Sequence, residues 1–154
     1  NLSGQVATLG SFWELLPALY AVSSIYCTPS IMEGFGMSIQ EAAACAVPAV
    51  SIHLVPYATD YLLGPAPHAI QAPGAATSLL VGQGAIVAQA DDTTGFVHAL
   101  NMLIEDTSLR EQMGHRAYDI TVPYFTWDHR VRDFLGQIGY GDLTEETPSH
   151  DSTA

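Results

Sequence analysis

Apolar residues in the first half of the chain follow a strand-like and a helix-like period in turn. Short runs rich in β-branched or aromatic residues predict strands at 6–9 (VATL), 24–27 (SIYC) and 48–52 (PAVSI). Between these runs, apolar residues at helical spacing predict one helix from about Ser11 and another over Met37–Ala46. Pro17 fits the first helix only if that helix begins near Trp13 or Glu14, since proline is tolerated in a first turn. Strands that alternate with helices predict an α/β fold with a parallel sheet.

The second half of the chain is predicted to add more helix than strand. A short helix is expected over Tyr57–Leu63, and the apolar run Ala85–Ala88 is expected to return to the sheet. Residues 64–84 are rich in Gly, Pro and Ala, so we predict a long surface loop there. Amphipathic segments predict three further helices, from Thr93 to about Ile104 with Asp91 or Asp92 as cap, from Thr107 or Ser108 to Tyr118, and from Trp127 to Ile138. Residues 139–154 form a polar tail that we predict to be disordered.

The most informative segment runs from Pro29 to Val50 and reads PSIMEGFGMSIQEAAACAVPAV. It places Glu33 and Glu41 around a Gly-Phe-Gly turn that joins the end of a predicted strand to the start of a helix. Open α/β sheets bind ligands beyond the carboxyl ends of their strands, and free amides at a helix start favour an anion there. We therefore expect both carboxylates to border one pocket, suited to a polyol and a diphosphate.

This segment resembles the retaining GT-B glycosyltransferases, in particular the large family 4. Glu33 and Glu41 match that family's motif of a glutamate, seven residues and a second glutamate. The flanks GSFWELLPALYAVSSIYC and AACAVPAV are also similar to the family, as is GAIVAQADDTTGFVHALNMLIEDTSLREQMGHRAYDITVPYFTWDHRV further on. The resemblance implies a partial Rossmann-like parallel sheet with flanking helices, which is the second half of a C-terminal donor-binding domain, followed by C-terminal helices.

For the sugar, the resemblance implies that Glu33 is the catalytic residue, hydrogen-bonding donor-sugar hydroxyls near the reacting carbon. Gly34, Phe35 and Gly36 would present backbone amides to the sugar, because glycine lets the chain approach closely and adopt a positive φ. The implied activity is transfer of a hexose from a nucleoside diphosphate sugar to an acceptor hydroxyl, with retention of the anomeric configuration. The nucleotide sugar is a substrate, and neither a cofactor nor a metal is implied.

For the nucleotide, the resemblance implies that the amides of Met37 and Ser38 contact the diphosphate, whose charge grows as the leaving group departs. Glu41 would accept two hydrogen bonds from the ribose hydroxyls, a task that suits an ionised carboxylate because it is a pure acceptor. These residues would bind the donor. The acceptor would be bound elsewhere.

Simpler hypotheses exist for the same residues. The sequence SIQE is also a capping box, with Ser38 as the N-cap and Glu41 at the third helical position. Glu33 would then be an ordinary solvated loop carboxylate, and the ring of Phe35 would only cover the helix start. A capping role predicts that Glu33→Ala and Glu41→Ala lose stability equally, with no selective effect on ligand binding.

The chain also departs from the family pattern. After Val50 and Ser51 the family has paired glycines and an acidic residue, whereas this chain has IHLVPY, so His53 and Asp60 become candidates for a contact at the pocket rim. We expect residues 1–138 to be part of a C-terminal domain whose missing N-terminal domain binds the acceptor. The alternatives are a non-catalytic accessory subunit that binds a nucleotide sugar and acts through a partner chain or a homo-oligomer, and an unrelated nucleotide binder.

Charge argues against a nucleic-acid partner. The formal net charge is −12 and the chain contains no lysine. Its four arginines all lie in the last third of the sequence, at positions 110, 116, 130 and 132. A surface that follows a phosphate backbone needs clustered basic residues, and this chain has none in its first two thirds. Helix-start amides would therefore have to hold a diphosphate without a local cation.

Cysteine and histidine usage predicts neither a disulfide framework nor a metal cluster. Cys27 and Cys45 are expected to be small buried apolar side chains, and the six histidines show no metal-ligand spacing. No apolar run reaches the roughly 18 residues of a membrane span, and no signal-peptide pattern begins the chain. We therefore expect a cytoplasmic protein.

Overall fold

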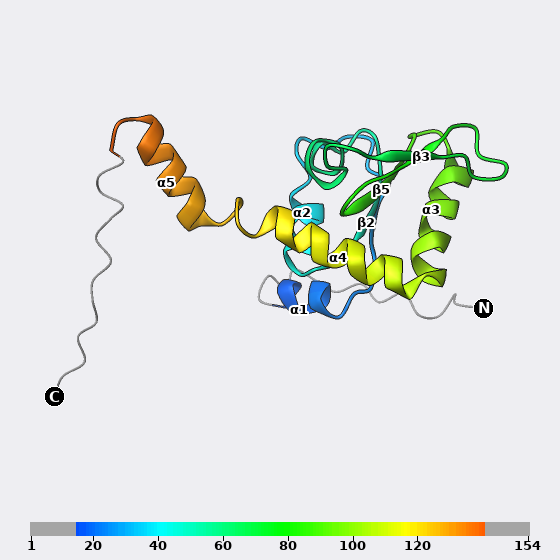
Figure 1. The fold of residues 1–154 in the computed structure, drawn as a ribbon, viewed down its shortest axis with the longest axis horizontal. Coiled ribbons are helices and arrows are strands. Elements are labelled where there is room, and N and C mark those ends of the chain that lie inside the picture. Colours follow the sequence, from blue (N-terminus) through cyan, green and yellow to red (C-terminus); the bar gives the residue numbers. More distant parts are fainter. Residues whose placement is uncertain (1–14, 141–154) are drawn as a thin grey trace.

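Five strands form one open sheet in the order β1-β2-β5-β4-β3 in the computed structural model, which describes residues 15–140 (Figure 1). The strands are β1 (Tyr26–Thr28), β2 (Ala49–Ile52), β3 (His68–Ile70), β4 (Leu79–Val81) and β5 (Ala85–Ala88). β1, β2 and β5 are parallel to one another, whereas β4 runs antiparallel to both β5 and β3. The predicted α/β class is confirmed. The predicted Rossmann-like parallel part is formed by β1, β2 and β5, and the antiparallel strands β4 and β3 make the sheet mixed.

Helices form at the positions that the periodicity predicts. They are α1 (Leu16–Ala21), α2 (Met37–Ala44), the π-helix η1 (Ala58–Leu62), α3 (Thr93–Glu105), α4 (Thr107–Thr121) and α5 (Trp127–Gln137). All but α5, which extends away from the rest of the fold in Figure 1, lie around the sheet. Pro17 lies in the first turn of α1, where its missing N–H has no intrahelical partner to lose. The predicted strand at 6–9 and most of the predicted polar tail, residues 141–154, lie outside the described residues.

The segment 64–84 is a β-hairpin and not the predicted surface loop. β3 and β4 pair antiparallel within it and extend the sheet beyond β5. Leu79 and Val81 are buried in the apolar core, which is what attaches the hairpin to the rest of the fold. Each strand has only three residues and lies among many Gly, Pro and Ala residues. The alternation of apolar and polar residues that predicts a strand is therefore too short to detect in this sequence. Tertiary packing therefore decides the structure of this segment.

Both faces of the central strands are covered, and Figure 1 shows α2 and α3 on opposite sides of β2 and β5. Along β5, Ala85 and Val87 pack into the core beneath α2 and η1, while Ile86 and Ala88 pack into the core beneath α3. All four are almost fully buried. Because the parallel strands β1, β2 and β5 end at one edge of the sheet, the loop that follows β1 lies at the edge where α/β proteins bind ligands.

Asp92 ties the hairpin to α3. As the N-cap of α3 its Oδ1 accepts a hydrogen bond of 2.8 Å from the amide of Gly95, and its Oδ2 accepts two of 2.9 Å from the amide and hydroxyl of Thr77. These bonds favour the ionised carboxylate. The amide of Gly95, followed by that of Thr77, holds the pKa of Asp92 below its ordinary value.

This lowered pKa predicts a pH-dependent contribution to stability. A carboxylate with a depressed folded-state pKa stabilises the fold above its unfolded-state value of 3.8, and the contribution is lost as the pH falls through the folded value. The difference in free energy of unfolding between wild type and Asp92→Asn should therefore be constant near neutral pH and shrink below about pH 4. Urea unfolding across pH measures it. Asp91→Asn, an exposed neighbour, is the control, and a difference that persists unchanged at low pH would contradict the assignment.

The cysteines are less buried than the sequence predicted. Cys27 is exposed because β1 is an edge strand of the described sheet, and Cys45 is half-buried as the C-cap of α2. Both thiols are free. Within residues 15–140, no helix has the length and apolar character needed to cross a membrane.

Candidate functional site

Gly36 sets the point at which the loop after β1 becomes helix α2. It is the N-cap of α2 and has a φ of +103°, in the left-handed region that favours glycine. A Cβ at this position would lie 2.9 Å from Cγ2 of Ile39 and 3.0 Å from Cγ1 of Val55. Gly34 differs, because a Cβ there would meet nothing within 4 Å. The fold itself therefore requires glycine at position 36, but it leaves room for a side chain at position 34.

Glu33 is held against the start of α2. Its Oε1 accepts a hydrogen bond of 3.2 Å from the amide of Gly36, and the side chain is half-buried. Its other oxygen, Oε2, has no hydrogen-bond partner among residues 15–140. The carboxylate is thus positioned by the backbone of its own loop, with one oxygen left to accept a bond from a ligand.

Two backbone amides at the start of α2 are also without an acceptor. The N–H groups of Met37 and Ser38 bond to no atom of the described residues, since first-turn amides have no intrahelical partner. The aligned peptide dipoles give this end of the helix a partial positive charge. No lysine or arginine precedes Arg110 in the sequence. The helix start is therefore suited to an anion.

Two tyrosines hold the side chains of Ser38 and Glu41. The hydroxyl of Tyr26 donates to Oγ of Ser38 at 2.8 Å, and the hydroxyl of Tyr20 donates to Oε2 of Glu41 at 3.0 Å. The two tyrosine rings pack edge to face with centroids 6.0 Å apart. Burial, and then the hydrogen bond to Glu41, raise the pKa of Tyr20, so its hydroxyl stays protonated and keeps donating.

The capping-box hypothesis for Ser38 and Glu41 is wrong. Helix α2 begins two residues before the box requires, because Gly36 can adopt the positive φ of the cap. Ser38 is therefore inside the helix, where its hydroxyl accepts from Tyr26, and no side chain caps α2. Glu41 lies one full turn into the helix and bonds to Tyr20 on α1. Neither side chain therefore accepts a hydrogen bond from a backbone amide at the start of α2.

The ring of Phe35 is committed to packing. It lies 5.4 Å from Tyr57, 6.0 Å from Tyr61 and 6.2 Å from Phe125, measured between ring centroids. The backbone carbonyl of Phe35 also accepts a 2.8 Å hydrogen bond from the amide of Tyr57, and the hydroxyl of Tyr57 bonds to Oγ1 of Thr121 at 2.7 Å. The ring anchors the loop to η1 and to the segment that follows α4.

The sequence was compared with models of known protein families. The family model described as "Glycosyl transferases group 1" matches residues 1–120. The chain belongs to this family. A comparison with curated proteins found no match. The match includes the whole of β1, the 29–36 loop and α2, so the residues described above lie in the part of the chain that is a group 1 glycosyltransferase domain.

In this glycosyltransferase, Glu41 borders a cleft of about 350 Å³ between α1 and α2. The other residues that line the cleft are Leu16, Pro17, Tyr20, Ala44 and Cys45. All of them except Tyr20 present mainly apolar surface, so the carboxylate of Glu41 is the charged group of this cleft. Glu33 does not line it, and the two carboxylates do not border this cleft together.

The rim candidates lie elsewhere in the glycosyltransferase. Nδ1 of His53 accepts a 3.2 Å hydrogen bond from the amide of Ala90, which leaves Nε2 to carry the proton of the neutral ring. His53 lines a cavity of about 440 Å³ at the carboxyl ends of β2 and β5, and Asp60 lines another, of about 850 Å³, next to η1. Neither lines the Glu41 cleft. Among the residues that the structure describes, no cluster of His, Cys, Asp or Glu could hold a metal ion.

Sequence reasoning missed the two tyrosines of this site. Tyr20 lies 21 positions from Glu41, and Tyr26 lies 12 positions from Ser38. The sequence pattern places them only in apolar runs, of the helix predicted from about Ser11 and of the strand predicted at 24–27. When the ring of a tyrosine is buried, its hydroxyl needs a hydrogen-bond partner. A tyrosine in an apolar run therefore indicates that a polar side chain lies nearby, and this was the signal that could have been used.

Proposed function

We propose that this chain is the donor-binding region of a retaining, family 4-like glycosyltransferase that transfers a hexose from a nucleoside diphosphate sugar to an acceptor hydroxyl. The observation that carries the proposal is the start of α2, where two unpaired amides lie beside a carboxylate held at the carboxyl edge of a Rossmann-like sheet. Phosphate groups suit the amides, and sugar hydroxyls suit the carboxylate. The acceptor would be bound by an N-terminal domain.

In this proposal Glu33 and the loop 34–36 serve the sugar. The free oxygen of Glu33 accepts from a sugar hydroxyl and orients the reacting carbon, while Gly34 leaves space for the ring to approach the backbone. As the bond to the diphosphate breaks, positive charge develops on the sugar and negative charge on the leaving group. Preorganised groups that match both charges lower the barrier without reorganising.

Met37, Ser38 and Glu41 serve the nucleotide. The amides of Met37 and Ser38 stabilise the leaving diphosphate, with help from the helix dipole and without a metal ion. Glu41 accepts from the ribose hydroxyls, and its hydrogen bond from Tyr20 fixes the carboxylate for this role. Because Glu41 lines the cleft between α1 and α2, the ribose would lie at the mouth of this cleft.

The proposal predicts a selective binding defect for Glu41→Gln. Loss of charge-assisted bonds to the ribose should weaken binding of the preferred donor about 10- to 100-fold, since such bonds contribute roughly 1.5–3 kcal/mol. The measurement is calorimetric titration of the native gene product with UDP-, GDP- and ADP-glucose, with free nucleotide and NAD as competitors. Glu105→Gln removes the same charge from an exposed position at the end of α3 and is the matched control.

Two outcomes would contradict this assignment. One is binding of nucleotide sugars that is unchanged in Glu41→Gln. The other is a preference for NAD or free nucleotide over every nucleotide sugar, which would favour an unrelated nucleotide binder. A thermal unfolding curve of the variant separates a binding defect from lost stability.

A further inference from the structure

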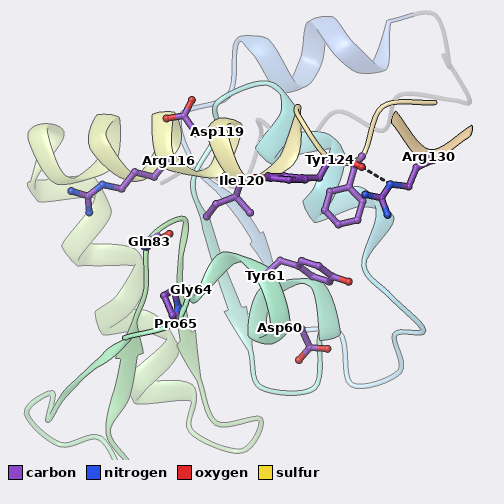
Figure 2. Close-up of a pocket in the computed structure, with 11 residues that line it drawn as sticks. Asp60, Tyr61, Gly64, Pro65, Gln83, Arg116, Asp119, Ile120, Tyr124 and Arg130 are labelled. Carbon is purple, nitrogen blue, oxygen red and sulfur yellow. Dashed lines mark hydrogen bonds between the residues drawn. The ribbon is translucent and has the colours of Figure 1, made fainter. Parts of the chain in front are cut away.

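A second cavity, of about 850 Å³, lies between α4, η1 and the first turn of α5 (Figure 2). Its charged and amide side chains come from four segments. They are Asp60 of η1, Gln83 of the turn before β5, Arg116 and Asp119 of α4, and Arg130 of α5. Cavities of this size typically take small molecules. Several of the lining residues are exposed, so solvent reaches the cavity.

Three exposed polar side chains of this cavity, those of Gln83, Arg116 and Asp119, are unpaired within the described part of the chain, whereas Asp60 accepts a 3.0 Å hydrogen bond from the hydroxyl of Thr59. Arg116 and Asp119 are one helical turn apart on α4, yet no ion pair within 4 Å joins them, and neither has another side-chain partner among the described residues. The side-chain amide of Gln83 is likewise without a partner in residues 15–140. Arg130 is used structurally, since it donates to the carbonyl of Tyr124 and pairs with Asp133 at 3.3 Å. Free donors and free acceptors thus line one space.

The cavity also has an aromatic wall. Tyr61 and Phe125 pack edge to face with centroids 5.1 Å apart, and Tyr124 lines the same cavity (Figure 2). The guanidinium of Arg130 lies over the ring of Phe125 at 5.3 Å and holds it in place. Because Arg130 covers Phe125, the exposed rings of Tyr61 and Tyr124 are the ones that can pack against the C–H face of a sugar.

Charge decides between a sugar and an anion. Two arginines and two aspartates line the cavity, so its formal charge is balanced, while the chain as a whole carries −12. A polyanion would approach against that field and meet the two carboxylates. A neutral sugar has hydroxyls that both donate and accept, which matches the mixture of guanidinium, amide and carboxylate groups.

We propose that this cavity is a second carbohydrate-binding site, for a neutral sugar or oligosaccharide. It is separate from the candidate donor site at the start of α2, and it does not depend on the function proposed there. The two sites share one wall, because Tyr61 and Phe125 line the cavity and also pack on the ring of Phe35 in the 29–36 loop.

The test is to titrate the native gene product with sucrose and with maltotriose in the absence of nucleotide. Binding is measured by saturation-transfer NMR or by calorimetry. We expect saturable millimolar binding of at least one of them. Arg116→Gln should weaken it about tenfold, since a hydrogen bond to a charged group is lost. Arg132→Gln is the matched control, because Arg132 pairs with Asp128 at 3.0 Å on α5 and does not line the cavity.

Glu41→Gln separates this proposal from the proposed function, because it should leave sugar binding unchanged whatever it does to nucleotide sugars. Absence of saturable binding of both sugars would overturn the proposal. So would a loss of sugar binding in Glu41→Gln but not in Arg116→Gln, which would place the sugar at the donor site. Binding of inorganic diphosphate that depends on Arg116, with no binding of either sugar, would show an anion site instead. Circular dichroism of Arg116→Gln, which changes an exposed side chain, verifies its fold.

Discussion

Gly36→Ala is expected to destabilise the protein by about 3 kcal/mol, from backbone strain of roughly 1–3 kcal/mol and overpacking of similar size. The strain arises because alanine would have to adopt a φ of +103°. The overpacking arises because its Cβ would press on Ile39 and Val55, both almost fully buried. The free energy of unfolding, from urea titration, measures the effect.

Gly34→Ala is the matched control for this prediction. Its Cβ would enter open space, so the change should alter stability by no more than about 0.5 kcal/mol. Equal stability of the two variants would mean that Gly36 does not cap α2 with the backbone described here. A loss in both would mean that the whole loop is tightly packed.

Glu33→Gln is expected to lower turnover of the native gene product about 10- to 1000-fold, which is the scale for loss of one preorganised electrostatic group. Donor affinity should change little, because the nucleotide contacts assigned to α2 remain. Glutamine keeps an Oε1 that can accept from the amide of Gly36, so the loop should keep its structure. The measurement is kcat for hexose transfer, together with the donor dissociation constant.

Glu105→Gln again serves as the control for a change of charge alone. Turnover that is unchanged in Glu33→Gln would remove Glu33 from the reaction. Donor binding weakened as much as in Glu41→Gln, with turnover unchanged at saturation, would make Glu33 a binding group and not a catalytic one.

Several elements, including those that carry the candidate site, could be predicted from sequence because their signals are local. β5 is a short apolar run that is buried on both faces, and α3 has its cap residue directly before its apolar stripe. The Gly-Phe-Gly turn between a strand and a helix indicated the start of α2. In each case the residues that determine the structure are neighbours in the chain.

What the sequence could not show depends on distant partners. The hairpin of β3 and β4 is stabilised by burial of Leu79 and Val81 and by bonds from Thr77 to Asp92, 15 positions later. The capping box had the correct residue types, but Gly36 and the hydroxyl of Tyr26 displaced it. Local propensity is overridden when tertiary contacts offer each polar group a better partner.

The packing of Phe35 against Phe125 has a consequence for the order in which the protein assembles. The 29–36 loop follows β1, early in the described residues, but the ring that encloses it on one side comes about 90 residues later, after α4. During synthesis on the ribosome, α2 can form long before that ring has been made. The loop therefore acquires its final enclosure only when nearly all of the domain has emerged, so the ligand-binding edge of the sheet is among the last parts to be completed.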